Sequence, residues 1–168
     1  PLITKGPELI TNGTFDSDTT GWTNRNGNTI RSLTSGQMEV ECGADDVAYS
    51  YQSITVVAGQ TYLLEADYDA NGGDARVYVG TGPGNNSLYD SGTLTSTGSI
   101  LTSVIPASTS LTVTFYADPV GTTGLSSLYD NISVKLAIPD LSEYGEPIIP
   151  VGMITATPLD SGVIAYSG

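Results

Sequence analysis

Several residue types that common protein chemistries require are scarce or absent in this chain of 168 residues. There is no His, so the usual general base and the commonest transition-metal ligand are both missing. Cys42 is the single cysteine, which excludes a disulfide framework within the chain and a cysteine-based zinc site. The Ser and Thr hydroxyls have no imidazole to activate them as nucleophiles. These absences argue against acyl-transfer and transition-metal catalysis.

Positive charge is also scarce. Five Lys and Arg residues stand against 18 Asp and Glu residues, which gives a formal net charge of −13 at pH 7. A surface this acidic repels phosphate backbones, so nucleic acid is not expected as a partner. No apolar run approaches the ~20 residues that a membrane-spanning helix needs, so a membrane is not expected as a partner either.

Two motifs resemble catalytic ones only superficially. Glu39 and Glu41 lie two residues apart, which on a strand places both carboxylates on one face about 7 Å apart. A paired-carboxylate hydrolase also needs a cleft that raises one pKa, and an exposed strand face rarely offers one. The glycine-rich stretch at 80–84 lacks the Lys and the following helix of a phosphate loop. We therefore expect no enzymatic activity and no catalytic residue.

Short alternating segments separated by turn residues predict an all-β chain. Turns recur every 8–12 residues or so, which is typical of an antiparallel β-sandwich. The predicted strands are 8–11, 30–33, 37–42, 48–56, 60–69, 75–80, 88–94, 99–105, 110–117 and 127–136.

Alternation within these segments predicts which side chains face the core. In the strand at 60–69, Glu65, Asp67 and Asp69 share one face, which must therefore contact water. The opposite face, with Tyr62 and Leu64, then faces the core. The same alternation turns an apolar set inward, namely Met38, Val40, Cys42, Val77, Val79, Leu111, Val113 and Phe115. It turns a second set outward, namely Arg76, Tyr78, Thr112, Thr114 and Tyr116. Cys42 is thus expected to be a buried, unreactive thiol.

Three short signatures are spread over most of the chain. Asn12-Gly13-Thr14-Phe15-Asp16 is followed by Gly21-Trp22, and Asp130-Asn131-Ile132-Ser133-Val134 closes the domain. Between them stands Gly59-Gln60-Thr61-Tyr62. Over residues 7–136 this pattern resembles the carbohydrate-binding-module jelly rolls, also described as galactose-binding-like sandwiches. The resemblance implies a jelly roll that follows a short lead (residues 1–6) and precedes an extended, Pro-rich arm or linker (residues 137–168).

The resemblance also implies a structural Ca²⁺ site at Asp16 and Asp130. In such sandwiches the acid after the first signature and the Asp of the closing strand often meet at Ca²⁺, with backbone carbonyls completing the six to eight oxygens that the ion needs. The family often carries Glu at the position of Asp16, so the shorter side chain is a departure. Alternatively, Asp16 caps a turn and Asp130 accepts hydrogen bonds from backbone amides.

A glycan site requires aromatic faces beside polar groups, because sugar rings present C–H patches and hydroxyls. Tyr49 and Tyr51 offer one aromatic pair on alternate positions. The main candidate set combines outward aromatic and charged residues, namely Arg76, Tyr78, Tyr116, Asp67 and Asp69. The alternative is that these are ordinary surface tyrosines of a β-sheet. Trp22 is expected to pack against the sandwich and not to be offered to a ligand.

Residues 137–168 differ from the rest, because prolines interrupt an apolar sequence without sustained alternation. We predict a docking arm that attaches the chain to a neighbour through five apolar residues, namely Ile148, Ile149, Val151, Met153 and Ile154. The alternative is a tail that folds back on its own sandwich.

Two functions agree with these features. The first is a non-enzymatic virion structural protein, because the signatures look like the small sandwich domains of tailed-bacteriophage structural proteins. A capsid decoration protein is favoured over a tail component, with other virion proteins, further copies of the chain and a cell-surface glycan as partners. Such a protein would be made in the host cytoplasm and reside in the virion. The second is a carbohydrate-binding module of a secreted polysaccharide-degrading enzyme.

Overall fold

The computed structural model describes residues 3–27, 29–44, 46–117 and 122–139. These residues form eleven strands and no helix, which confirms the predicted all-β class. None of the described elements is therefore a helix that could cross a lipid bilayer. The strands are β1 (Ile3–Glu8), β2 (Thr23–Asn24), β3 (Thr29–Thr34), β4 (Gln37–Cys42), β5 (Ala48–Thr55), β6 (Tyr62–Asp69), β7 (Ala75–Gly80), β8 (Tyr89–Asp90), β9 (Thr97–Val104), β10 (Ser110–Ala117) and β11 (Ser126–Pro139).

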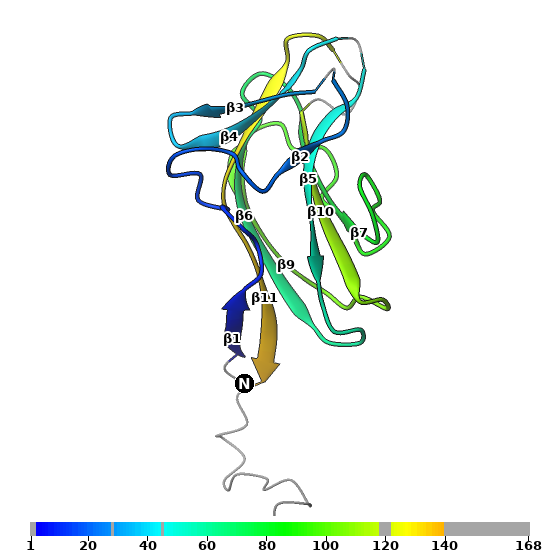
Figure 1. Ribbon diagram of the computed structural model, residues 1–168. Helices are drawn as coiled ribbons and strands as arrows, with labels where there is room; N and C mark the ends of the chain where they lie inside the picture. The colour runs from blue at the N-terminus through cyan, green and yellow to red at the C-terminus, as the bar shows by residue number, and fades with distance from the viewer. Residues whose placement is uncertain (1–2, 28, 45, 118–121, 140–168) are drawn as a thin grey trace, which may run out of the picture.

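Two antiparallel sheets pack face to face (Figure 1). The first, here the β6 sheet, has the order β3-β4-β11-β6-β9, with β1 paired to the far end of β11. The second, the β10 sheet, has the order β2-β5-β10-β7-β8. Strands that follow one another in the chain thus often lie in opposite sheets, as expected for a jelly-roll sandwich.

The core lies between the sheets and contains the apolar set that alternation turns inward. Met38, Val40, Val77, Val113 and Phe115 have no exposed surface. Cys42 is also fully buried, and its thiol donates to the Ala117 carbonyl oxygen at 3.0 Å. The predicted inward faces of β4, β7 and β10 are therefore confirmed, together with the burial of Cys42.

Trp22 closes one end of the core, as predicted. Its side chain is buried and its ring packs edge-on against Phe115, with centroids 5.5 Å apart. The ring also lies 5.8 Å from that of Phe15, and its indole N–H donates to the Asn12 carbonyl oxygen at 3.1 Å. The first signature is thus a local structure in which the loop supplies both a ring and an acceptor for the indole.

The first strand differs from the prediction at 8–11. It runs from Ile3 to Glu8 and pairs with the last residues of β11, so the lead and Ala137–Pro139 form a ribbon (Figure 1). The strand ends where the Glu8 carboxylate accepts hydrogen bonds from the amides of Ile10 and Val134, at 3.0 and 2.9 Å. Burial alone would raise the pKa of Glu8, but the bonds from Ser133 and these amides lower it overall. These side-chain bonds stand beside the main-chain bond from the Leu9 amide to the Val134 carbonyl oxygen, at 3.0 Å, and alternation cannot show them.

Two further strand predictions need correction. The segment predicted at 88–94 contains only the two-residue β8, followed by a single bridge between Ala75 and Leu94. The Gly and Ser that follow β8 form a turn at Gly92, whose φ of 67° lies in the region that glycine favours. The short β2 lies between the predicted strands 8–11 and 30–33, where no strand was predicted.

Tyr129 ties the two sheets together. It belongs to β11 in the β6 sheet and is fully buried. Its hydroxyl donates to the Tyr116 carbonyl oxygen and accepts from the Arg76 amide at 3.3 Å, in the paired strands β10 and β7 of the other sheet. Burial raises the pKa of this phenol, which therefore remains protonated.

Candidate functional site

The structure brings the two predicted calcium ligands into one neighbourhood. A bulge in β11 after Asp130 puts Asn131 at φ 49° and turns the Ile132 amide to donate to the Gly13 carbonyl oxygen at 2.9 Å. The loop that carries Asp16 is thereby held against β11. Burial is the main reason why the pKa of Asp130 is raised, and the charges of Asp67 and Asp16 add to it, against the bond from the Asn131 amide.

The carboxylate oxygens of Asp16, Asp67 and Asp130 meet the requirements of a Ca²⁺ site only in part. Asp130 accepts from the Asn131 amide at 2.7 Å, as the alternative interpretation expects of it. Asp16 accepts from a side chain, the Thr14 hydroxyl, at 3.1 Å, which does not test whether it caps a turn. Asp67 accepts from Ser99 and from the Asn131 side chain. The described residues contain no group of three or more Asp, Glu, His or Cys side chains arranged to hold a metal ion. A calcium site at Asp16 and Asp130 stays a prediction.

The predicted glycan set is divided between the two outer faces. Asp67 and Asp69 belong to β6, whereas Arg76 and Tyr78 belong to β7 and Tyr116 to β10. Because β6 and β7 lie in different sheets, the two acids face away from the other three residues. Alternation predicted correctly that all five point outward, but it does not show on which sheet. Grouping Asp67 and Asp69 with the others was wrong.

The remaining three residues belong to a row of tyrosines on the outside of the β10 sheet. In the strand register, Tyr116 lies between Tyr49 and Arg76, and Thr114 lies between Tyr51 and Tyr78. The ring of Tyr116 is 4.8 Å from that of Tyr49 and 4.8 Å from that of Tyr78. We call this surface the tyrosine face, made of Tyr49, Tyr51, Tyr78, Tyr116, Arg25 and Arg76.

Each end of the tyrosine face has a guanidinium group over a ring and a carboxylate beside it. Arg76 lies 5.0 Å from the Tyr78 ring centre and makes two bonds to Asp90, at 2.9 and 2.7 Å. Arg25 lies 5.9 Å from the Tyr49 ring centre and pairs with Asp46 at 2.7 Å. The hydrogen bonds from Arg76, with those from Gly92 and Asn86, lower the pKa of Asp90 to about 2, so it is ionised at neutral pH.

The middle of the tyrosine face is covered by the loop between β7 and β8. The Gly84 amide donates to the Thr114 hydroxyl at 3.1 Å, and the Tyr116 hydroxyl donates to the Gly84 carbonyl oxygen at 3.4 Å. Tyr116 is therefore only 6% exposed and Thr114 is fully buried, although both point outward. The expectation that Tyr116 offers its ring to a sugar is corrected. Tyr49, Tyr51 and Tyr78 stay partly exposed on either side of the loop.

Sequence reasoning missed Arg25, Asp46 and Asp90. Arg25 and Asp46 lie in loops, where alternation gives no direction, and Asp90 lies in the shortened β8. Composition offered one usable signal. The chain has only five basic residues, and two of them stack on tyrosines of one face.

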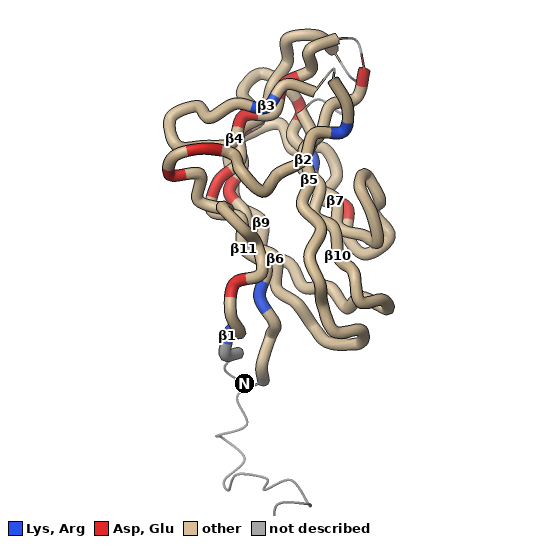
Figure 2. The backbone as a smooth tube through the Cα atoms, viewed as in Figure 1, with Lys and Arg blue, Asp and Glu red and all other residues tan. Residues whose placement is uncertain are grey.

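Acidic residues lie along β4, β6 and β11 of the β6 sheet (Figure 2), and the alternation with buried residues places those of β4 and β6 on its outer face. Glu39 accepts from the hydroxyls of Thr34, Ser32 and Ser126, and the bond from Thr34 is the main reason why its pKa is lowered. An ionised carboxylate in this setting is a poor proton donor. The contacts of Glu39 support the interpretation that the pair with Glu41 is not catalytic, and activity itself stays untested.

No family model matches the chain, and no curated protein matches it in sequence. Solved structures match the fold. The xylan-binding CBM22-1 domain of Paenibacillus barcinonensis Xyn10C is 16% identical, with a TM-score of 0.59 over 80% of this chain and 97% of that one. A cyclase from Fischerella sp. TAU is 13% identical, with a TM-score of 0.60 over 83% and 100%. The enzymatically active domain of bacteriophage CBA120 tailspike protein 4 is 12% identical, with a TM-score of 0.57 over 77% and 21%. These similarities confirm a jelly-roll sandwich like that of carbohydrate-binding modules.

Proposed function

We propose that the chain is a glycan-binding sandwich and that the tyrosine face is its binding surface. The observation that carries the proposal is the gathering of partly exposed tyrosine rings with two Arg–carboxylate pairs on one outer face. A ring face accepts the C–H patch of a sugar, while guanidinium and carboxylate groups bond to its hydroxyls. Both halves of the face supply these elements, Arg25, Tyr49 and Tyr51 on one side of the loop and Arg76 and Tyr78 on the other.

The fold supports the same proposal without establishing it, because one fold serves many functions. The matched CBM22-1 domain binds xylan, which makes soluble xylan the first polysaccharide to test. The virion role predicted from sequence stays a prediction, and so do the capsid location and the virion partners. A virion adhesin and a module of a secreted enzyme would both use a glycan-binding sandwich, so the proposal does not depend on which is right.

Binding to the tyrosine face is testable with two alanine variants and a matched control. We expect the wild-type chain to be retarded in affinity gels by at least one of a panel of soluble polysaccharides. Tyr51→Ala or Tyr78→Ala should weaken that binding about fivefold, because a stacked aromatic contributes roughly 1 kcal/mol beyond its area. Leu101→Ala, on the outside of the other sheet, should bind like wild type. Equal loss in all three variants, or no retardation by any polysaccharide, would contradict the proposal.

A further inference from the structure

One sheet edge combines an unpaired strand with exposed apolar side chains. Within the described ranges, β9 pairs only with β6, so its other edge has no partner strand. Its eight residues contain no charged residue and no proline, which are the usual means of preventing a further strand from pairing at an edge. Such an edge is open to strand addition.

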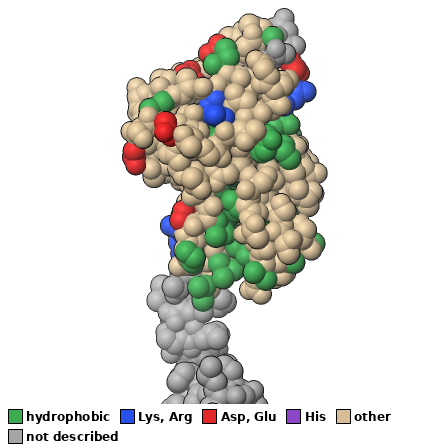
Figure 3. All heavy atoms as spheres, in the orientation of Figure 1, with side chains coloured by type: hydrophobic (Ala, Val, Ile, Leu, Met, Phe, Trp, Pro, Cys, Tyr) green, Lys and Arg blue, Asp and Glu red, His purple; other side chains and the backbone are tan. Residues whose placement is uncertain are grey.

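The same end of the sandwich exposes several large apolar side chains. Leu101 in β9 is 71% exposed, and Ile105 just after it is 58% exposed. Val57 and Ile138, from neighbouring elements of that end, are 61% and 41% exposed. Figure 3 shows hydrophobic side chains gathered there. Isolated exposed apolar residues are ordinary, but Leu101 and Ile105 both lie on or directly after the strand with the free edge, which indicates a covered surface.

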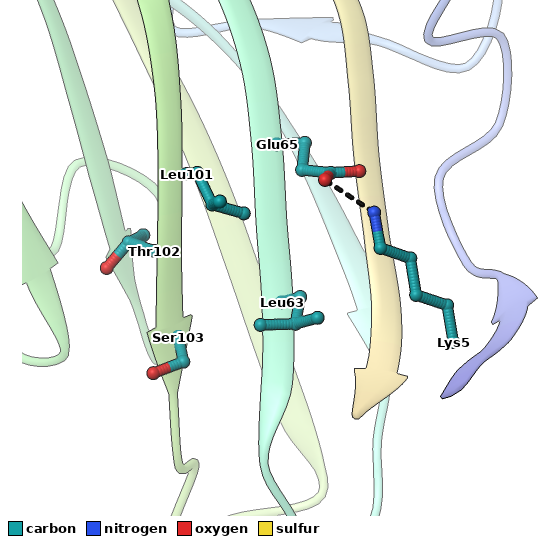
Figure 4. Close-up of a pocket in the computed structure, with 6 residues that line it drawn as sticks. All are labelled: Lys5, Leu63, Glu65, Leu101, Thr102 and Ser103. Carbon is teal, nitrogen blue, oxygen red and sulfur yellow. Dashed lines mark hydrogen bonds and ion pairs between the residues drawn. The ribbon is translucent and has the colours of Figure 1, made fainter. Parts of the chain in front are cut away.

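A depression of ≈ 520 Å³ adjoins this edge on the outside of the sheet (Figure 4). Leu63 and Leu101 form its apolar floor, on the neighbouring strands β6 and β9. Lys5 reaches over β11 to Glu65, at 2.5 Å, and forms one polar side. Apolar side chains would fit the floor of such a site.

We propose that residues 148–154 of the same chain add to β9 as a further antiparallel strand of the β6 sheet. The predicted docking segment, with Ile148, Ile149, Val151, Met153 and Ile154, lies outside the described residues. Its attachment point is described, however. β11 ends at Pro139, at the end of the sheet where β6 begins and β9 ends. There Leu136 of β11 pairs with Tyr62 of β6, and Tyr62 pairs with Val104 of β9.

The direction and length of the chain agree with this placement. Both β11 and β9 run antiparallel to β6, so they are parallel to each other, and a segment that turns back after Pro139 would run antiparallel to β9. The position beyond β9 is three strand spacings from β11, about 14 Å. The residues between Pro139 and Ile148 can span about 26 Å when extended. A tether this short gives an effective concentration in the millimolar range, which favours docking within one molecule.

The proline pattern fits an outermost strand. In a strand, residues whose N–H and C=O point to one neighbour alternate with residues that point the other way. If the main-chain N–H and C=O groups of Ile149, Val151 and Met153 point to β9, then those of residue 150 point to solvent. Pro150 lacks an N–H, and at that position no hydrogen bond of the sheet is lost. The side chains of Ile148, Pro150 and Ile154 then lie on the face of this strand opposite to the side chains of Ile149, Val151 and Met153. Both faces carry apolar side chains, one toward buried Ile100 and the other toward Leu101.

Amide hydrogen exchange in the full chain tests this placement. In the wild type, the β9 amides that point away from β6 should exchange slowly. Val151→Pro removes an N–H that points to β9 and should speed exchange of these amides more than tenfold. Gly152→Pro removes an N–H that points to solvent and should leave their exchange unchanged. The amides of β3, at the other edge of the same sheet, show in each variant that the sandwich is intact.

Two outcomes would overturn the proposal. One is that the outward β9 amides exchange equally fast in the wild type and in Val151→Pro, or change equally in both proline variants. The other concerns the source of the segment, measured by light scattering over a range of concentrations. A monomer with protected β9 amides is expected. A dimer whose β9 protection disappears on dilution would assign the segment to a second copy of the chain and reject docking within one molecule.

Discussion

Trp22→Ala is expected to lower the free energy of unfolding by ~3–5 kcal/mol, the usual cost of deleting a large buried aromatic side chain. The ring packs between Phe15 and Phe115 at the end of the core, so its deletion leaves a cavity between these two rings. The indole N–H also holds the Asn12 carbonyl. Urea unfolding followed by circular dichroism would measure the change, and native Trp22 fluorescence should be blue-shifted and shielded from iodide.

Two matched variants make this measurement specific. Trp22→Phe keeps an aromatic ring and loses the bond to Asn12, so it should cost clearly less than Trp22→Ala. Thr95→Ala changes an exposed residue outside the strands and should change stability by less than ~0.5 kcal/mol. A native Trp22 that iodide quenches freely and that responds to added sugar would contradict a packing role.

Calcium is expected to raise the melting temperature through Asp130, with Asp16 assisting. A ligand that binds only the native state adds ~2.7 kcal/mol at a hundredfold excess over its Kd, which corresponds to several degrees for a domain of this size. Asp130→Asn should abolish the shift between calcium and chelator. Glu41→Gln, on another strand of the same sheet, should preserve it. Superimposable wild-type melting curves in calcium and in chelator would contradict the predicted calcium site.

The same variant has an opposite expected effect in chelator. Because the folded-state pKa of Asp130 is raised, protonation of Asp130 stabilises the fold, and its charged form is unfavourable above that pKa. Asp130→Asn removes this charge and keeps an oxygen to accept the Asn131 amide, so it should melt at a higher temperature than wild type at pH 7. The difference should shrink as the pH falls through the raised pKa of folded Asp130 toward the unfolded value of about 4, because wild-type Asp130 is then increasingly protonated.

Alternation predicted the buried faces of β4, β7 and β10, because successive side chains of a strand point to opposite faces. The jelly roll was implied by the resemblance of the three signatures. Alternation does not reveal which sheet a strand joins, so Asp67 and Asp69 were grouped with three residues of the other sheet, Arg76, Tyr78 and Tyr116. It also does not reveal what covers an outward residue. Tyr116 points outward and is nevertheless buried, because the loop that follows β7 folds over it.

Main-chain contacts were the other unpredictable element. The end of β1 is set by the bonds of the Glu8 carboxylate to amides near the end of the domain, and a bulge at Asn131 holds the Asp16 loop. Each depends on residues that are distant in sequence. The signatures around Asn12 and Asp130 marked these two segments in the sequence, and in the structure the two segments contact each other.

The contact between Gly13 and Ile132 has a consequence for biosynthesis. A methyl group at Gly13 would lie 2.0 Å from the Ile132 carbonyl oxygen, and because that atom is main chain, no rotamer change could relieve the overlap. The Asn12–Asp16 loop thus completes its shape only against β11, which leaves the ribosome after the ten other described strands. Long-range pairing of this kind slows folding. The nascent chain would hold its first segment without a partner until translation of the domain ends, and fold as a unit afterwards.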